Sequence, residues 1–166
     1  MTWHPLAPVE AGYFDAAPFI YRYPVELPVP PERVWASLTS DHALKDWRLG
    51  LPDLHWTSPR PFGVGTTRSV TLPAWLITVH ERFFRWEEGA RMSFAVYEAN
   101  RPLLTSLAED YLVEPIEGGC RFTWTMAFTP TDRVRRAAKA GDRLNRRLCR
   151  AVPIRAKAYF ARHPAG

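Results

Sequence analysis

The sequence has little cysteine and no long uninterrupted apolar run. Cys120 and Cys149 are the only cysteines among 166 residues, so they form no disulfide framework, and they lack metal-ligand spacing. A chain without a disulfide set is typical of a reducing compartment, and we expect a cytoplasmic protein. No apolar run approaches the roughly 18 residues of a membrane-spanning helix. The first residues also lack the basic and apolar regions of a signal peptide.

Sequence motifs for metal binding, nucleophilic catalysis and phosphate binding are also missing. The five histidines are scattered and show no ligand spacing, and no serine or cysteine lies in a nucleophile-elbow pattern. Gly63-Val64-Gly65 lacks the following glycine and the helix of a phosphate-binding loop. We therefore expect neither a metal nor another cofactor.

Positive charge is concentrated at the C-terminal end of the chain. The net charge is +5, but from Thr131 onward eleven Lys and Arg face only Asp132 and Asp142, which leaves −4 for the remainder (5 − 9). Two interpretations of this positive charge are open. The charged residues form the solvated outer face of a helix, or they contact an anionic membrane surface or nucleic acid. Because no aromatic residue is interleaved until Tyr159, base stacking has little support and nucleic acid is not favoured.

The segment Leu104–Thr129 is the clearest structural pattern. Two runs of alternating residues flank Glu117-Gly118-Gly119, which predicts a β-hairpin with a two-residue loop at either Glu117-Gly118 or Gly118-Gly119. Either loop places Glu109 and Tyr111 on the same face as Trp124.

Elsewhere the periodicity predicts more strands, three helices and an arm. The expected strands are Ile20–Pro28, Leu54–Ser58, Val64–Leu72, Trp75–Trp86 and Arg91–Glu98. Helical spacing predicts short helices at Pro30–Leu38 and Asp41–Trp47, and a long one over Thr131–His163 that Pro153 kinks or ends. We expect residues 1–19 to form an extended arm and residues 20–163 a single domain.

This order of elements predicts an α+β fold. A curved antiparallel β-sheet wraps around the long C-terminal helix, with two short helices after the first strand. Alanine and glycine on the inner face of the helix leave space against the sheet, which makes a cavity there plausible.

Two expected turns set the register of the middle strands. Two-residue loops at Pro73-Ala74 and Glu88-Gly89 give the pairs Leu72–Trp75, Val70–Ile77, Arg68–Val79, Phe83–Phe94 and Glu81–Val96. One face then carries Arg68, Val70, Leu72, Ile77, Val79, Glu81, Phe83, Met92, Phe94 and Val96. Because this face is the more apolar, it is expected to point towards the helix.

Three charged residues, Arg68, Glu81 and Glu109, lie on this inner face with Tyr111 and Trp124. Buried charge is costly, so these groups must pair, form hydrogen bonds or change protonation state. Three interpretations remain open: a structural Arg–Glu pair, a solvated residue at a cavity mouth, or a carboxylate with a raised pKa acting as general acid/base. Glu81 and Glu109 are the candidate catalytic residues, with Arg68 or Tyr111 steadying an enolate-like oxygen.

The order and spacing of several short motifs resemble the START-like helix-grip superfamily (SRPBCC), and within it the polyketide cyclase/dehydrase-like proteins. The motifs are Val29–Leu38, Asp46-Trp47, Phe62–Thr66, Glu81 with Trp86, and Gly118–Trp124. The resemblance spans Ile20 to Phe160 and implies the helix-grip fold. The superfamily includes lipid carriers, aromatase/cyclases and hormone receptors, so the resemblance leaves the activity open.

Two functions of the inner face follow as hypotheses. The first is binding of a small hydrophobic molecule (a lipid, a polyketide or an aromatic metabolite) in the cavity between sheet and helix. The expected ligand-binding residues are Arg68, Val70, Phe83, Phe94, Val96, Tyr111, Trp124, Met126, Leu144 and Leu148. The second is a cofactor-independent polyketide cyclase or dehydratase that uses Glu81 or Glu109. The sequence leaves the oligomeric state open, and the arm's aromatic residues could cover the cavity mouth or a neighbouring molecule.

Overall fold

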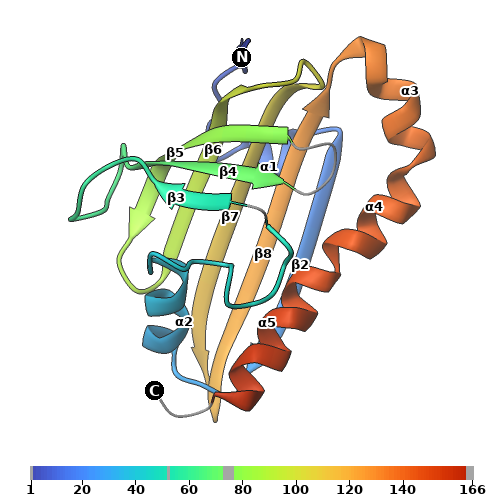
Figure 1. The fold of residues 1–166 in the computed structure, drawn as a ribbon. Helices are drawn as coiled ribbons and strands as arrows, with labels where there is room; N and C mark the ends of the chain where they lie inside the picture. The colour runs from blue at the N-terminus through green and yellow to red at the C-terminus, as the bar shows by residue number, and fades with distance from the viewer. Residues whose placement is uncertain (1, 52, 73–76, 164–166) are drawn as a thin grey trace.

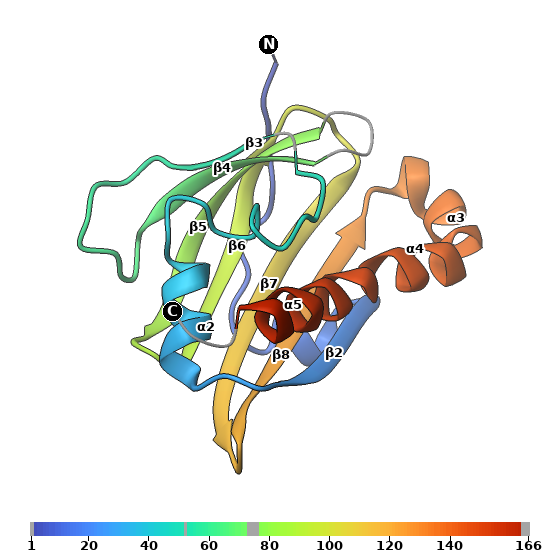
Figure 2. The same cartoon turned by 60° about the horizontal axis from the view of Figure 1, so that its bottom comes forward.

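A computed structural model describes residues 2–51, 53–72 and 77–163. A strongly curved antiparallel sheet forms one layer, and the C-terminal helices and a short helix cover its concave side (Figures 1 and 2). The strands are β1 (His4–Pro5), β2 (Phe19–Leu27), β3 (Asp53–Trp56), β4 (Thr67–Leu72), β5 (Ile77–Glu87), β6 (Arg91–Ala99), β7 (Leu104–Ile116) and β8 (Gly119–Pro130). The helices are α1 (Tyr13–Ala16), α2 (Pro31–Leu38), α3 (Asp132–Ala140), α4 (Asp142–Cys149) and α5 (Ala151–Arg162).

The strand order is β2-β8-β7-β6-β5-β4-β3, and the short β1 pairs with β6. Strands β3 to β8 therefore form a meander, and β2 joins it beside β8. This arrangement confirms the α+β fold with a curved antiparallel sheet and a C-terminal helix. Residues 41–48, where the sequence suggested a second short helix, form consecutive turns, because Leu44 and Arg48 have positive φ angles of 63° and 55°.

The hairpin of β7 and β8 closes at Glu117-Gly118, one of the two predicted loops, with Gly118 at φ 78°. Tyr111 pairs with Trp124 and Glu109 with Met126, so the predicted face is confirmed. Gly118 supplies the positive φ angle that a tight hairpin turn of this kind requires.

The predicted register between β5 and β6 is confirmed although its turn differs. Phe83 pairs with Phe94 and Glu81 with Val96. Glu87 pairs with Arg91, so the loop holds three residues rather than two, and a bulge between Phe83 and Arg85 compensates for the added residue.

The predicted register between β4 and β5 is wrong by two residues. Arg68 pairs with Glu81 rather than Val79, and Val70 pairs with Val79 rather than Ile77. The predicted Pro73-Ala74 turn lies outside the described residues. The last described pair of these two strands is Leu72–Ile77. Because the shift is even, every side chain keeps its predicted face.

The C-terminal helix consists of three segments that break at Gly141 and Arg150. The predicted break before Pro153 is found, since α4 ends at Cys149. A proline ring clashes with the carbonyl group of the residue four positions earlier, and for Pro153 that residue is Cys149. Segment α5 packs on the core through Pro153, Ala156 and Phe160. No helix in the described part of the chain is both long and apolar enough to cross a membrane.

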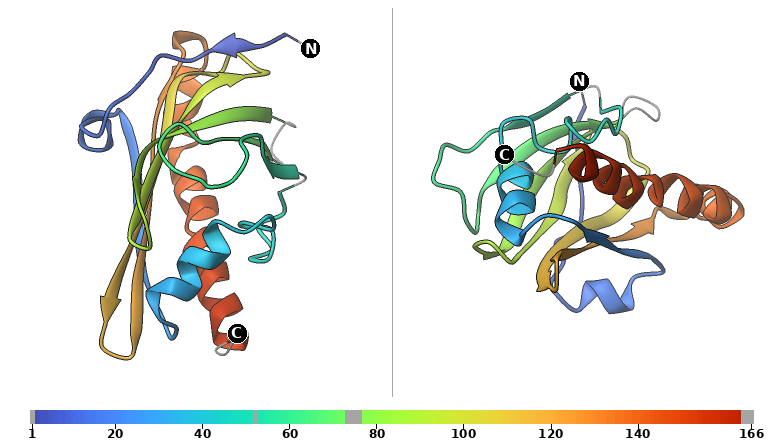
Figure 3. Two further views of the ribbon diagram at one scale, coloured as in Figure 1. Left: turned by 90° about the vertical axis from the view of Figure 1, so that its left-hand side faces the viewer. Right: turned by 90° about the horizontal axis from the view of Figure 1, so that it is seen from below.

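The N-terminal arm lies against the convex side of the sheet, opposite the helices (Figure 3, left). Phe14 of α1 is buried with Ala108 and Ala127, and Trp3 stacks on His80 with ring centroids 4.1 Å apart. The aromatic side chains of Trp3 and Phe14 therefore pack on the convex face of this chain.

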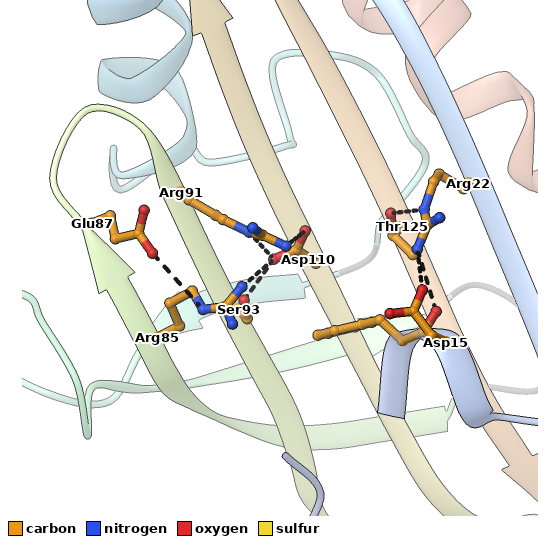
Figure 4. A network of polar contacts seen from close by, with 9 residues as sticks. Asp15, Arg22, Arg85, Glu87, Arg91, Ser93, Asp110 and Thr125 are labelled. Carbon is orange, nitrogen blue, oxygen red and sulfur yellow. Dashed lines mark hydrogen bonds and ion pairs between the residues drawn. The ribbon is translucent and has the colours of Figure 1, made fainter. Parts of the chain in front are cut away.

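Polar side chains on the convex face form a network of hydrogen bonds and ion pairs (Figure 4). The buried Asp110 carboxylate accepts hydrogen bonds from Ser93 Oγ at 2.6 Å and from Arg91 at 2.9 and 3.1 Å. Arg85 lies 3.9 Å from the same carboxylate. These contacts satisfy the hydrogen-bonding capacity of the buried Asp110 carboxylate, and its neighbour Glu109 points to the opposite face.

Candidate functional site

Five polar or aromatic side chains meet on the concave face of the sheet. We call Arg68, Glu81, Glu109, Tyr111 and Trp124 the concave-face cluster. Four strands supply them: β4 and β5 one residue each, β7 two, and β8 one, with β6 lying between β5 and β7 in the sheet. Strand alternation turns all five to the same side, where the sequence placed them.

Arg68 and Glu81 face each other across β4 and β5 and form a buried ion pair. Arg68 Nε lies 2.5 Å from Glu81 Oε2, and the side chains are 1% and 6% exposed. Burial raises the pKa of the Glu81 carboxyl, whereas the Arg68 charge and hydrogen bond lower it. Glu81 therefore supplies the negative partner that the buried Arg68 needs.

Aromatic rings surround the guanidinium of Arg68. Its central carbon lies 4.3 Å from the ring centroid of Phe94, 5.2 Å from that of Phe83 and 5.5 Å from that of Trp56. These cation–π contacts stabilise the charge without satisfying its N–H groups. Arg68 Nη1 is buried and has no hydrogen-bond partner among the residues that the structure describes. A buried donor of this kind is available to a ligand oxygen.

Glu109 has hydrogen-bond donors but no salt bridge within the described residues. Tyr111 Oη donates to its Oε2 at 2.9 Å, and Trp124 Nε1 donates to the same oxygen at 2.8 Å. The pKa of Glu109 is raised to about 7, mainly by burial and next by the nearby charge of Glu81. The hydrogen bonds from Trp124 and Tyr111 and the charge of Arg68 lower it in part. Glu109 therefore changes charge near neutral pH.

Glu109 also differs from Glu81 in its accessibility. Glu81 is buried, whereas Glu109 as a residue is only half-buried. Both donors bind Oε2, and no described residue donates to Oε1. A partly exposed carboxyl with a free oxygen and a pKa near 7 can accept or donate a proton to a bound molecule.

Cys149 brings helix α4 next to the cluster. Burial raises the pKa of its thiol to about 12, and the charge of Glu109 contributes to that rise. Periodicity alone did not single out Cys149 or Trp56. Cys149 lies one helical turn before Pro153, and Trp56 lies within the predicted strand Leu54–Ser58. Their contacts with the cluster depend on the tertiary fold.

The structure brings together most of the predicted ligand-binding residues but not all of them. Those buried on the concave face are Arg68, Val70, Phe83, Phe94, Val96, Tyr111 and Trp124. Met126 is partly buried. Leu144 and Leu148 are 60% and 61% exposed on α4. Hydrogen bonds from Tyr21 and Tyr23 of β2 hold the Asp142 and Arg146 side of α4 against the sheet edge. Leu144 and Leu148 lie about 200° further around this helix and therefore face away from β2.

A pocket of about 460 Å³ lies between the sheet edge and the C-terminal helix. Its lining residues are Pro18, Phe19, Pro130, Arg135, Lys139 and Asp142. None of them belongs to the concave-face cluster. Within the part of the chain that the structure describes, no group of three or more His, Cys, Asp and Glu side chains is arranged to hold a metal ion.

Comparisons with known proteins give relatives over most of the chain. A family model described as polyketide cyclase/dehydrase and lipid transport matches residues 19–158. Uncharacterised proteins of Mycobacterium tuberculosis and Mycobacterium bovis are 38% identical over 124 residues, which is 75% of this chain and 74% of each relative.

Solved structures share the fold at lower sequence identity. A Thermus thermophilus protein has a TM-score of 0.71 at 16% identity and covers 89% of this chain and 100% of its own. XoxI from Bacillus cereus has a TM-score of 0.65 at 18% identity and covers 89% and 99%. At these identities the likeness establishes the architecture alone.

Proposed function

Because this chain belongs to the polyketide cyclase/dehydrase and lipid transport family, we propose that it binds a small hydrophobic molecule carrying a carbonyl or hydroxyl group. The molecule is a lipid, a polyketide or an aromatic metabolite, held between the sheet and the C-terminal helix. The observation that carries the proposal is Glu109: a partly exposed carboxyl with a pKa of about 7, among buried aromatic side chains.

Two polar groups suit the polar end of such a ligand. Arg68 Nη1 is a buried donor without a partner in the described structure, and Glu109 Oε1 receives no hydrogen bond from a described residue. A ligand carbonyl oxygen would accept from Arg68, and a ligand hydroxyl would donate to Glu109. Each contact would satisfy a group that is costly to leave unpaired in an apolar surrounding.

Apolar side chains around these groups suit the rest of the ligand. Val70, Phe83, Phe94 and Val96 are buried on the concave face, and Met126 is partly exposed beside them. A largely apolar lining with few polar groups is typical of sites for hydrophobic small molecules. Leu144 and Leu148 are exposed on α4 and would contact a ligand only at the outer margin of the site.

The binding proposal is tested by native mass spectrometry of protein purified from its own host, followed by extraction of any bound molecule. We expect a retained hydrophobic molecule. Met126→Trp fills the concave face and should abolish retention. Thr123→Trp adds a similar side chain to the opposite face of β8 and should leave retention intact. An empty wild-type protein, or equal retention in both variants, overturns the proposal.

Catalysis is a second candidate, and the pKa of Glu109 near 7 favours it. As a carboxylate, Glu109 would remove a proton from the carbon next to a ligand carbonyl, and Arg68 Nη1 would donate a hydrogen bond to the enolate oxygen. The enolate carbon would attack a second carbonyl to form a carbon–carbon bond. Glu109 would then return its proton to the new alkoxide. Glu81 is held in its ion pair with Arg68, so it would position the arginine rather than transfer protons.

The catalytic proposal is tested on the molecule that the protein retains. Glu109→Gln keeps an acceptor for Tyr111 and Trp124 but cannot take up a proton. We expect turnover to fall by about 10²–10⁴-fold while binding persists. Glu117→Gln, in the exposed hairpin turn, is the matched control. Unchanged turnover in Glu109→Gln overturns the catalytic role of Glu109. If the wild-type protein binds the molecule without converting it, the catalytic proposal is overturned and the binding proposal stands.

A further inference from the structure

Helices α3 and α4 expose apolar side chains that no described part of the chain covers. Together they span Asp132–Ala140 and Asp142–Cys149, and neither has a buried residue. Leu144 and Leu148 are 60% and 61% exposed. Short helices gain most of their stability from packing an apolar face against a partner. An uncovered leucine pair on such helices points to a partner outside the monomer.

The same two helices carry excess positive charge. Arg135 pairs with Asp132 at 2.7 Å, and Arg146 pairs with Asp142 at 2.8 Å. These pairs use both acidic residues of the segment. The cations that have no salt bridge among the described residues are Arg133, Arg136, Lys139, Arg143, Arg147 and Arg150. The two helices and Arg150 after them therefore present six exposed positive charges without a salt bridge among the described residues.

The leucines and two of the arginines form parallel rows on α4. Leu144 and Leu148 are four residues apart and share one side of the helix. Arg143 and Arg147 each precede a leucine by one residue, which places their row about 100° around the helix. Helices α3 and α4 run along the outer edge of the molecule, with α4 beside β2 (Figures 1 and 2). A flat surface can therefore reach both rows.

We propose that α3 and α4 dock this protein onto an anionic lipid bilayer. Leu144 and Leu148 enter the boundary between headgroups and acyl chains, and the arginine row contacts lipid phosphates. A bilayer suits this surface better than nucleic acid because residues 132–150 contain no aromatic side chain for base stacking, whereas aliphatic side chains are exposed.

The proposed docking surface is continuous with the folded core, because Cys149, the last residue of α4, packs partly buried against it. The docking proposal itself stands on the exposed leucines and the unpaired cations, and it does not depend on what the concave face binds.

The experiment is flotation of the full chain with two kinds of vesicle: equal parts phosphatidylglycerol and phosphatidylcholine, and phosphatidylcholine alone. We expect binding to the anionic vesicles only, weakened when salt is raised from about 0.1 M to about 1 M. Arg143→Gln/Arg147→Gln should weaken binding by roughly tenfold or more. Leu144→Ser/Leu148→Ser should weaken it by a similar factor.

Two matched controls separate this surface from general charge and hydrophobicity. Arg82→Gln/Arg101→Gln removes two exposed cations elsewhere and gives the same net charge of +3 (5 − 2). Val64→Ser removes an apolar side chain that is 69% exposed in a distant loop. Both control variants should float like the wild type.

Several outcomes would overturn the docking proposal. One is equal binding to neutral vesicles, and another is equal loss of binding in the α4 variants and their controls. A third is the absence of vesicle binding together with a dimer in light scattering that Leu144→Ser/Leu148→Ser dissociates, which would make the surface a self-association interface. A fourth is salt-sensitive binding of duplex DNA without vesicle binding.

Discussion

Arg68 and Glu81 lie directly opposite each other on β4 and β5 and are joined by an ion pair whose side chains are 1% and 6% exposed. Glu109 shares their face but pairs with neither in a salt bridge. Arg68 therefore compensates the charge of the Glu81 carboxyl. The Glu109 carboxyl has no such partner, and with a pKa of about 7 it can bind or release a proton near neutral pH.

Breaking the Arg68–Glu81 pair should destabilise the fold. Arg68→Met leaves the Glu81 carboxyl buried without its partner, which costs about 3–5 kcal/mol in free energy of unfolding. The double variant Arg68→Met/Glu81→Leu should recover a large part of that loss, because it removes both charges. Urea unfolding of the single and double variants checks this. Additive losses in the double variant would contradict the coupling.

Glu109 should make stability depend on pH. Its pKa rises from the usual 4.5 to about 7 on folding, so the folded state binds more protons than the unfolded state between these values. The free energy of unfolding should fall as pH rises from about 4.5 to about 7 and then level off. Glu109→Gln should therefore be more stable than the wild type at pH 8, by on the order of 2 kcal/mol, and similar at pH 4.5. Thermal unfolding at both pH values measures the difference, and Glu117→Gln should show none.

Trp124 should tune the protonation of Glu109. Its indole N–H donates to the carboxylate at 2.8 Å and opposes the rise caused by burial. Trp124→Phe should therefore raise the pKa of Glu109 above 7. A ¹³C NMR titration of the glutamate carboxyl groups measures it. Trp86→Phe, which removes a donor to Glu88 instead, should leave the Glu109 titration in place.

Gly119 should not tolerate a side chain. A Cβ atom at this position would collide with the carbonyl oxygen of Leu27, where β2 meets β8. Gly119→Ala should lower the free energy of unfolding by more than about 2 kcal/mol, because backbone atoms cannot move aside cheaply. Gly63→Ala has open space around its Cβ and is the control. Equal stability of the two variants in urea would contradict the close approach.

The exposed leucines should matter little for folding. Leu144→Ser/Leu148→Ser should change the free energy of unfolding by about 0.5 kcal/mol or less per site, because both side chains are largely solvated. Phe160→Ala on α5 removes a side chain that is 1% exposed and should cost about 3–5 kcal/mol. Urea unfolding of both variants compares them. A large loss in the leucine variant would mean that these side chains pack within the monomer.

The sequence by itself determined the strand faces and the family. Alternation in Leu104–Thr129 placed Glu109, Tyr111 and Trp124 on one side, because side chains along a strand repeat every two residues. That period also kept Arg68 on the correct face when its predicted register was wrong by two residues. The proline at position 153 likewise predicted the helix break before it.

Only the tertiary structure decided which partners these residues meet. The observed register of β4 and β5 placed Arg68 opposite Glu81, and the curvature of the sheet gathered aromatic rings from β3, β5 and β6 around it. The direction of α3 and α4 left Leu144 and Leu148 exposed although their spacing favours a buried face. Periodicity specifies which way a side chain points from its own element, whereas contact depends on where the other elements lie.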